Sequence, residues 1–267
     1  MDLDEFLRRR VAEREWAYAN GFNNGDPETN GEFACLGMLI RSADLFVDVG
    51  ANEGDFIDRA SQFKRDLPVI AFEPNPAHGS MLRAKLSSSG RLEAVALSDK
   101  AGLADLHVHV RHHATASLSA RTRMSKRFQA EIRSQSVPVR RLDEYADEFA
   151  AEAALLVKID AEGFEFPVMR GGDTLLTRAA PCAVMFEFSF AWLETGEDLL
   201  ACFQFLDERG FDFYRILPIG LEHLRFYSAD MDRAQYCNYV ALKGFPLPPA
   251  VDVASLYGRN ALHPFSS

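Results

Sequence analysis

Residues 45–55 read LFVDVGANEGD, an apolar run that ends in an acidic residue and opens into a glycine-rich turn. This pattern predicts a buried strand over residues 45–49, a tight turn, and a helix over residues 55–64. Glycines at such a turn let the backbone N–H groups of the helix start approach a ligand closely. Unless it is a plain tight turn, the stretch therefore lies at the ligand-binding edge of a parallel sheet.

The same alternation of short apolar runs and amphipathic stretches continues along the chain. We expect further strands over residues 68–72, 92–97, 155–159 and 183–188, and helices over residues 76–86, 164–176 and 198–208. Continuous apolar strands separated by helices predict a doubly wound α/β fold, with a parallel sheet covered on both faces. Two last strands, over 211–217 and 236–242, are separated by a loop with little helical pattern and so predict an antiparallel pair.

The N-terminal part has a different pattern. Residues 2–19 have apolar positions spaced for a helix, residues 20–27 are rich in turn formers, and residues 31–42 again have helical spacing. We therefore divide the chain into an N-terminal helical extension, residues 1–44, and a catalytic domain, residues 45–267.

Composition narrows the class of protein. The 267 residues are 48% hydrophobic and 25% charged, which is typical of a globular chain. The net charge of −10 argues against a nucleic acid partner. We find no apolar run long enough for a membrane span and no secretory signal, so we expect no membrane insertion. The cysteines are far apart and form no CxxC pair, which indicates reduced thiols in a cytoplasmic protein.

The turn after the first strand discriminates between two cofactors. A dinucleotide site needs G-x-G-x-x-G, whereas Gly50, Asn52 and Gly54 give G-x-N-x-G. The carboxylate of Asp48 would also repel a pyrophosphate. It suits a ligand with positive charge and no phosphate, as S-adenosylmethionine is. We assign Asp48, Gly50, Asn52 and Gly54 to the methionine part of that cofactor.

Two other strand ends complete the expected cofactor site. Glu73 ends the second strand, 23 residues after Gly50, where an acid can accept both ribose hydroxyls of an adenosine. It could instead be a carboxylate favoured by a helix start. Ser98 or Asp99, after the third strand, could meet the exocyclic amine of adenine or could form a surface turn.

The end of the fourth strand carries several charges. Strand alternation puts Lys158 and Asp160 on one face, with Glu162 just beyond them, and the next strand carries Glu187 in an apolar run. Charges at a buried strand end are costly unless they are paired or functional. Lys158 could form a structural pair with Asp160 or Glu162, or the carboxylates could act on a substrate.

These segments, taken together, resemble a known family. VDVGANEGDF, AFEPNP, VALSD, VPVRRLDEY, LVKIDAEGFEFPVMRGG and MFEFS follow one another between residues 45 and 190. In this order they are similar to the FkbM family of S-adenosylmethionine-dependent methyltransferases. The resemblance implies a Rossmann-like class I methyltransferase fold, a seven-stranded sheet whose last strand is antiparallel. It also implies O-methyl transfer, commonly to sugar hydroxyls of glycans or to natural products.

Methyl transfer to a hydroxyl needs orientation and a group that takes the proton. The candidates are Asp160, Glu162 and Glu187, with Asp160 expected nearest to the methyl group. The histidines His109, His112, His113 and His223 are further candidates for the base. The three carboxylates could also hold a hard cation, but we assign no metal site.

One segment is basic in an otherwise acidic chain. Residues 112–133 contain Arg121, Arg123, Lys126, Arg127 and Arg133 against one acid, Glu131. This is either a solvated face or a lid over an anionic acceptor, such as a phosphate-linked glycan. The acceptor is thus a small molecule or glycan that could be anionic. Two other functions stay open: an inactive binding module on the same fold, and a nicotinamide-dependent oxidoreductase.

Overall fold

The computed structural model describes residues 22–109, 112–119, 132–150, 152–228 and 236–245, with Glu5, Glu15, Ala17, Tyr18, Met231 and residues 262–263. Glu5, Glu15, Ala17 and Tyr18 are helical. The rest of the helix expected over residues 2–19 lies outside the described residues. Residues 110–111 and 120–131, which hold most of the basic segment, lie outside them too.

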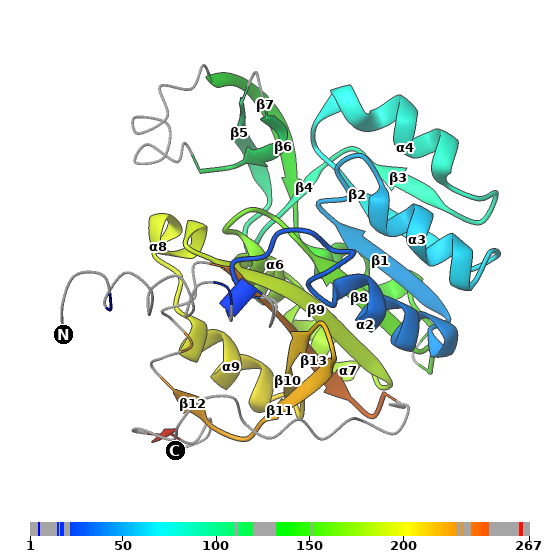
Figure 1. Ribbon diagram of the computed structural model, residues 1–267. Coiled ribbons are helices and arrows are strands. Elements are labelled where there is room, and N and C mark those ends of the chain that lie inside the picture. The colour runs from blue at the N-terminus through cyan, green and yellow to red at the C-terminus, as the bar shows by residue number, and fades with distance from the viewer. Residues whose placement is uncertain are drawn as a thin grey trace.

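The centre of the molecule is a sheet of eight strands (Figure 1). In spatial order they are β11 (Gly220–Leu224), β10 (Asp212–Leu217), β13 (Tyr236–Lys243), β9 (Cys182–Ser189), β8 (Leu155–Ile159), β1 (Leu45–Val49), β2 (Val69–Phe72) and β3 (Arg91–Glu93). Strands β3, β2, β1, β8 and β9 are parallel, and β13 runs antiparallel to both β9 and β10. The expected doubly wound sheet with an antiparallel last strand is therefore confirmed, and β11 extends it at the β10 edge.

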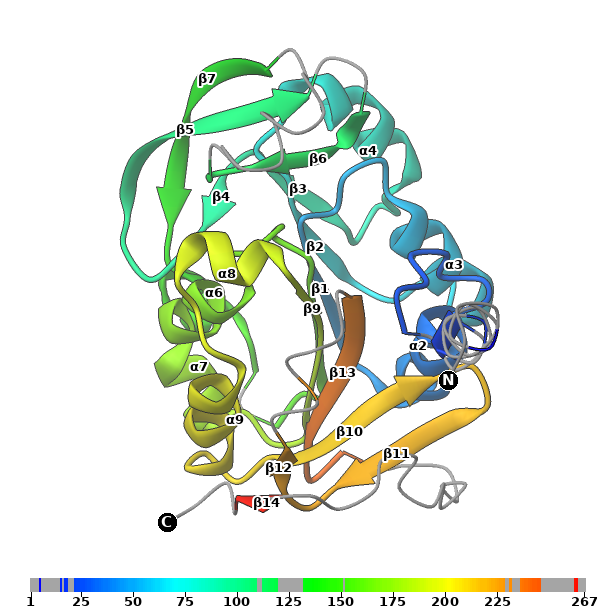
Figure 2. The same ribbon diagram turned by 60° about the vertical axis from the view of Figure 1, so that its left-hand side comes forward.

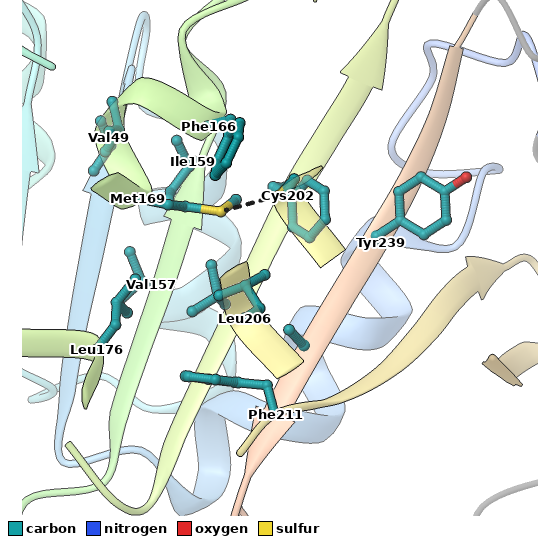
Figure 3. Packing of buried hydrophobic residues seen from close by; sticks show 14 of the residues in the cluster. Val49, Val157, Ile159, Phe166, Met169, Leu176, Cys202, Leu206, Phe211 and Tyr239 are labelled. Carbon is teal, nitrogen blue, oxygen red and sulfur yellow. Dashed lines mark hydrogen bonds between the residues drawn. The ribbon is translucent and has the colours of Figure 1, made fainter. Parts of the chain in front are cut away.

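Side-chain alternation gives the sheet two apolar faces. Val47 and Val49 of β1 pack in one core cluster with Phe166 and Cys202, whereas Phe46 packs in a second cluster with Leu36. Helices α6 (Glu165–Gly171), α7 (Asp173–Arg178) and α9 (Leu199–Asp207) cover the first face, and α2 (Glu32–Leu39), α3 (Asp55–Phe63) and α4 (Gly79–Lys85) cover the second. Figure 3 shows the first cluster, where the Cys202 thiol lies 3.6 Å from the Met169 sulfur. Residues 32–39 of α2 thus share a core with the sheet.

Two expected elements are divided in the structure. The strand expected over residues 92–97 splits into β3 of the main sheet and β4 (Ala96–Leu97) of a second sheet. The helix expected over residues 164–176 breaks at Gly172 into α6 and α7. Close packing explains the glycines there, since a Cβ on Gly171 would lie 2.1 Å from the Ser98 carbonyl oxygen.

The second sheet is an insertion between β3 and β8. It contains β4, β7 (Ile132–Arg140), β5 (Gly102–His109) and β6 (His112–Ser117) in that order. Its small core consists of Ala96, Leu106, Val137 and Val139. Both ribbon views place it beyond one end of the main sheet (Figures 1 and 2). The short elements are η1 (Ile40–Ser42), η2 (Pro76–His78), η3 (Leu142–Glu148), α8 (Ala191–Thr195), β12 (Tyr227–Ser228) and β14 (Leu262–His263).

Candidate active site

Three parallel strands, β1, β2 and β8, end together at one edge of the main sheet, where the neighbouring strand β9 continues for three more residues. Val49 of β1 is in register with Phe72 of β2 and with Ile159 of β8, and Ile159 is in register with Phe186 of β9. The next residue along each strand is the one that carries the chemistry: Gly50, Glu73, Asp160 and Glu187. The edge therefore brings together residues that lie 137 positions apart in the sequence, as the positions of Gly50 and Glu187 give.

Asp48 is a buried carboxylate on the α2–α3 face of β1. It is only 1% exposed, and neither of its oxygens has a hydrogen-bond donor among the described residues. Burial raises its pKa to about 7, the charge of Lys158 opposes this, and the charges of Asp160 and Glu73 add to it. A buried polar group without a partner is costly. Both oxygens of Asp48 could therefore accept a hydrogen bond from a donor in the site.

The turn after β1 is held by its backbone conformation. Gly50 has φ 78°, and a Cβ at this position would lie 1.9 Å from the Asp160 carbonyl oxygen. Asn52 also has a positive φ, 49°, and its Oδ1 has no partner among the described residues. Gly54, with φ 85°, precedes α3 and packs against Leu82 instead of lining the cavities described below. Gly50 and Asn52 thus line both cavities described below, and Gly54 sets the start of α3.

Glu73 is fixed by the two turns that flank it. Its Oε2 accepts the N–H of Asn52 at 2.8 Å, and its Oε1 accepts the N–H of Asn75 at 2.8 Å. Burial raises the pKa of this carboxyl, against the two backbone hydrogen bonds, which lower it. Each carboxylate oxygen has two acceptor positions, so both oxygens can still accept a hydroxyl from a ligand.

A first cavity extends from Glu73 between the main sheet and the inserted sheet. Its apolar lining includes Phe72, Val95, Leu97, Leu106 and Phe164. Ser98 and Asp99 do not line it. The Asp99 carboxylate instead accepts Arg170 Nε at 3.3 Å, and Ser98 Oγ donates to Asp99 Oδ1 at 3.3 Å. The third strand therefore presents apolar side chains to this cavity, where the sequence predicted polar ones.

A second, larger cavity of about 520 Å³ opens on the other side of Gly50 and Asn52. Seven carboxylates and one ammonium are found among the described residues that line it: Glu32, Asp48, Glu53, Asp55, Asp160, Glu162 and Glu187 against Lys158. Its aromatic lining consists of Phe56, Phe190 and Tyr236. We call this the acidic cleft. It contains all three residues that the sequence predicted as catalytic.

Lys158 and Asp160 form an ion pair at the floor of the acidic cleft. The Lys158 Nζ lies 3.0 Å from Asp160 Oδ2 and 4.1 Å from the centre of the Phe56 ring. Burial would lower the pKa of Lys158, but the charges of Asp160, Asp48 and Glu32 outweigh it and raise the pKa above its usual value. Lys158 therefore stays protonated. The sequence offered Asp160 or Glu162 as the partner of Lys158, and the structure shows the pair with Asp160.

The turn after β8 is strained and tightly held. Glu162 has φ 54° and Gly163 has φ 101°. The carboxylate of Glu165 accepts the N–H groups of Ala161 and Gly163 at 2.9 and 3.0 Å, and Ser117 Oγ of the inserted sheet donates to the Glu162 carbonyl at 2.9 Å. Burial and the charge of Asp160 raise the pKa of Glu165 to about 8. Glu165, which sequence reasoning did not single out, thus holds the loop that presents Asp160 and Glu162.

Two further residues of the acidic cleft were not predicted. Glu32, at the start of α2, is 7% exposed and accepts Asn30 Nδ2 at 2.7 Å. The Tyr236 hydroxyl of β13 lies 3.5 Å from the same Glu32 oxygen. They are 204 residues apart, and no local motif marks either of them. Only the folded sheet brings them together.

Of the four histidines expected as possible bases, the structure describes the side chain of His223. His223 lies exposed on the edge strand β11 and stacks on Tyr214 with ring centres 4.8 Å apart. The side chains of His109, His112 and His113 lie outside the described residues. So do Arg121, Arg123, Lys126 and Arg127, whereas Arg133 is exposed on β7.

The described part of the chain contains no group of three or more His, Cys, Asp or Glu side chains arranged to share a metal ion. None of its helices combines the length and the apolar character that crossing a membrane requires.

The strand order, the antiparallel β13 and the polar residues at the ends of β1, β2 and β8 define a Rossmann-like class I methyltransferase fold. The model of the methyltransferase FkbM domain matches residues 48–213, more than half of the chain, and the chain belongs to this family. The protein is thus a methyltransferase by family.

Similar proteins were found both by sequence and by structure. The chain is 26% identical over 189 residues to the 2-O-methyltransferase NoeI of Sinorhizobium fredii, covering 66% of this chain and 76% of that protein. The N-methyltransferase NodS of Bradyrhizobium japonicum, solved with S-adenosylhomocysteine, aligns with a TM-score of 0.43 at 12% identity over 87% of this chain and 96% of its own. The precorrin-6y C5,15-methyltransferase of Geobacter metallireducens aligns with a TM-score of 0.41 at 12% identity over 79% and 88% of the two chains.

Proposed function

We propose that this protein is an S-adenosylmethionine-dependent O-methyltransferase that acts on a hydroxyl of a sugar, glycan or natural product. The observation that carries the proposal is Asp48, a buried carboxylate that lines the acidic cleft and has no hydrogen-bond donor among the described residues. A pyrophosphate beside this carboxylate would be repelled, whereas an ammonium would be attracted. Membership of the FkbM family supports the same cofactor.

The residues at the sheet edge divide among the parts of this cofactor. Glu73 would accept the ribose hydroxyls, because both of its oxygens are held in place by backbone N–H groups. The apolar lining of the first cavity, including Val95, Leu97 and Phe164, would enclose the adenine. Asp48, Gly50 and Asn52 would hold the methionine part, where the unpartnered oxygens of Asp48 and Asn52 lie. When bound, the cofactor supplies a methyl group on a positively charged sulfur.

The protein's own contribution to the reaction is then orientation and proton removal. A sugar hydroxyl has a high pKa, so a side chain that accepts its proton lowers the barrier. Asp160, Glu162 and Glu187 line the acidic cleft, and Asp160 and Glu162 also line the first cavity. They are the acid–base candidates of the site.

The acidic cleft also bears on the acceptor. The NoeI relative is described as a 2-O-methyltransferase, which supports a hydroxyl acceptor here. Seven carboxylates against one ammonium favour a neutral or a positively charged acceptor over an anionic one. Phe190, which lines the cleft and is partly exposed, offers apolar contact to a sugar ring or an aglycone. Four buried, unpaired cysteines suit a reducing compartment, so we place the reaction in the cytoplasm.

The experiment is a methyl-transfer screen with S-adenosylmethionine carrying a radiolabelled methyl group. Neutral sugars, amino sugars, sugar nucleotides, lipid-linked glycans and hydroxylated natural products serve as acceptors. We expect label in at least one hydroxylated acceptor and none with the Glu73→Ala variant, and the exposed-site variant Glu152→Gln serves as control. Cofactor binding without transfer to any acceptor would instead indicate a binding module.

A further inference from the structure

The ends of three neighbouring strands give the two central carboxylates different surroundings. Ile159 of β8 is in register with Phe186 of β9, so Asp160 and Glu187 follow side by side. On its other side Glu187 is in register with Asn238 of β13. Strand alternation then puts Tyr236, two residues before Asn238, on the same face as Glu187. Glu187 thus lies between the strands that carry Asp160 and Tyr236, and all three line the acidic cleft.

Asp160 is already paired. Its Oδ2 lies 3.0 Å from the Lys158 ammonium, which is 3% exposed and packs on the Phe56 ring. Lys158 also faces Asp48 directly across the β1–β8 ladder. A carboxylate held by a permanent, buried ammonium is a weak proton acceptor, because taking a proton would break the pair.

We propose that Glu187 takes the proton from the acceptor hydroxyl, and that Glu32 and Tyr236 position the acceptor beside it. This inference rests on the proposed O-methyl transfer, and it assigns one residue to proton removal and two residues to positioning of the acceptor. Glu32 and Tyr236 both lie outside the segment matched by the family model, residues 48–213. The acceptor end of the cleft would thus be completed by chain segments that flank the family domain.

The surroundings of Glu187 raise its affinity for a proton. Burial raises its pKa well above the usual value, and the charges of Asp160, Glu162, Glu165 and Glu32 raise it further. These charges come from the loop after β8, from α6 and from α2, while Tyr236 faces Glu187 from β13. A base with a raised pKa holds a transferred proton better than an ordinary carboxylate does.

In the proposed transfer, the O–H bond of the acceptor breaks and its proton goes to an oxygen of Glu187. The electron pair of the acceptor oxygen forms the new O–CH₃ bond. The pair of the S–CH₃ bond stays on sulfur, which becomes neutral. Glu187 then loses the proton to water through the open side of the cleft.

Glu32 and Tyr236 are built as a unit. Asn30 Nδ2 donates to Glu32 Oε2 at 2.7 Å, and Asn30 Oδ1 accepts the Glu32 N–H at 2.9 Å. The N–H of Asn23 donates to the Tyr236 carbonyl at 3.0 Å, which ties the segment before α2 to β13. Burial and the charges of Glu187 and Glu32 raise the pKa of Tyr236, so its hydroxyl keeps its proton, which it donates to Glu32 Oε2 at 3.5 Å. The pair thus presents the Tyr236 hydroxyl oxygen and the Glu32 carboxylate as hydrogen-bond acceptors to an acceptor molecule.

The test compares Glu187→Gln, Glu187→Asp, Asp160→Asn, Glu32→Gln and Tyr236→Phe by methyl-transfer kinetics against pH. Each variant is first checked for folding by circular dichroism and for S-adenosylhomocysteine binding by calorimetry. We expect Glu187→Gln to bind normally and to lose about 100-fold or more in kcat, with partial recovery in Glu187→Asp. We expect kcat of the wild type to fall at low pH as Glu187 becomes protonated, and we call this fall the acid limb. It should persist in Asp160→Asn and vanish in Glu187→Gln.

The two positioning residues have separate signatures. Glu32→Gln removes a negative charge near Glu187, so the acid limb should move to lower pH. Tyr236→Phe should raise the acceptor KM about fivefold, as loss of one hydrogen bond predicts, with kcat within about threefold. A kcat of Glu187→Gln within threefold of wild type would overturn the role of Glu187. An acid limb that does not move in Glu32→Gln would overturn the role of Glu32, and an acceptor KM that does not change in Tyr236→Phe would overturn the role of Tyr236. Absence of transfer by the wild type overturns the proposed function itself.

Discussion

Asp48 and Lys158 face each other across the β1–β8 ladder, and both are almost completely buried. The Lys158 ammonium makes its close contact with Asp160, however, and not with Asp48. One ammonium therefore stabilises several carboxylates, and Asp48 keeps its two oxygens free for a ligand. The unliganded site contains a negative charge whose burial destabilises the folded state.

This arrangement predicts how stability depends on pH in the Asp48→Asn variant. The pKa of Asp48 rises from 3.8 in the unfolded chain to about 7 in the folded protein. The unfolded chain then releases this proton first as the pH rises, so the contribution of Asp48 lowers the free energy of unfolding between about pH 4 and pH 7. We expect the variant to match wild type near pH 4 and to be more stable by about 2–4 kcal/mol above pH 7.

Urea denaturation of both proteins without ligand, at a series of pH values, measures this difference. A constant difference across the whole range would contradict the pKa shift. The variant should also bind S-adenosylmethionine more weakly, since it lacks the carboxylate for the ammonium.

The turn after β1 predicts a large effect for Gly50→Ala. Gly50 and Gly196 have the same φ of 78°, but a Cβ on Gly196 would meet nothing within 4 Å, whereas one on Gly50 would lie 1.9 Å from the Asp160 carbonyl oxygen. Gly196→Ala should cost about 1 kcal/mol for the left-handed conformation alone. Gly50→Ala should cost at least about 2 kcal/mol more and should displace Asp160. Thermal and urea unfolding of the matched pair give the comparison, and equal losses would show that the close approach is unimportant.

Glu73 predicts a loss of cofactor affinity. Glu73→Ala removes the acceptor for two ribose hydroxyls, and loss of these charge-assisted hydrogen bonds should weaken S-adenosylhomocysteine binding by about 2–3 kcal/mol. Calorimetry on the folded variant measures this, with Glu152→Gln, an exposed carboxylate, as the matched control. Unchanged affinity in Glu73→Ala would remove Glu73 from the site.

The acidic cleft predicts the charge preference for acceptors. Among acceptors with the same ring, one with an amine should have the lowest KM and one with a carboxylate the highest. Salt screens such attraction over about 8–10 Å at physiological ionic strength, so the KM of the amine should rise with salt and that of the carboxylate should fall. Glu53→Gln, which removes one lining charge, should reduce both slopes. The opposite order of KM values would favour the basic segment of residues 112–133 as the recognition element.

Local pattern was sufficient to predict the sheet edge. The strands expected over residues 45–49 and 155–159 coincide with β1 and β8, because fully buried parallel strands consist of continuous apolar runs bounded by turns. Glu73 and Asp160 directly follow such runs, Asp48 and Glu187 lie near the ends of theirs, and the topology brings the four together. The inserted sheet was missed, since β5 and β7 have mixed polar sequences and one largely exposed side.

Long-range contacts explain what else the sequence did not give. Ser98 and Asp99 were expected near the adenine, but Asp99 pairs with Arg170, which lies 71 residues away. Glu32 and Tyr236 meet only because α2 and β13 share the core on one face of the sheet. The role of Glu165 as the clamp of the 160–163 turn depends on its burial, and burial of a charged residue has no signature in the local pattern.

The central claim is that this sheet edge binds S-adenosylmethionine and not a dinucleotide. Titration calorimetry of the wild-type protein with S-adenosylhomocysteine, and separately with NAD, tests it without knowledge of the acceptor. We predict one S-adenosylhomocysteine bound per chain, with binding weakened by about 2–3 kcal/mol in Glu73→Ala, and no heat of binding with NAD. Binding of NAD, or no binding of S-adenosylhomocysteine by the folded protein, would contradict the assignment.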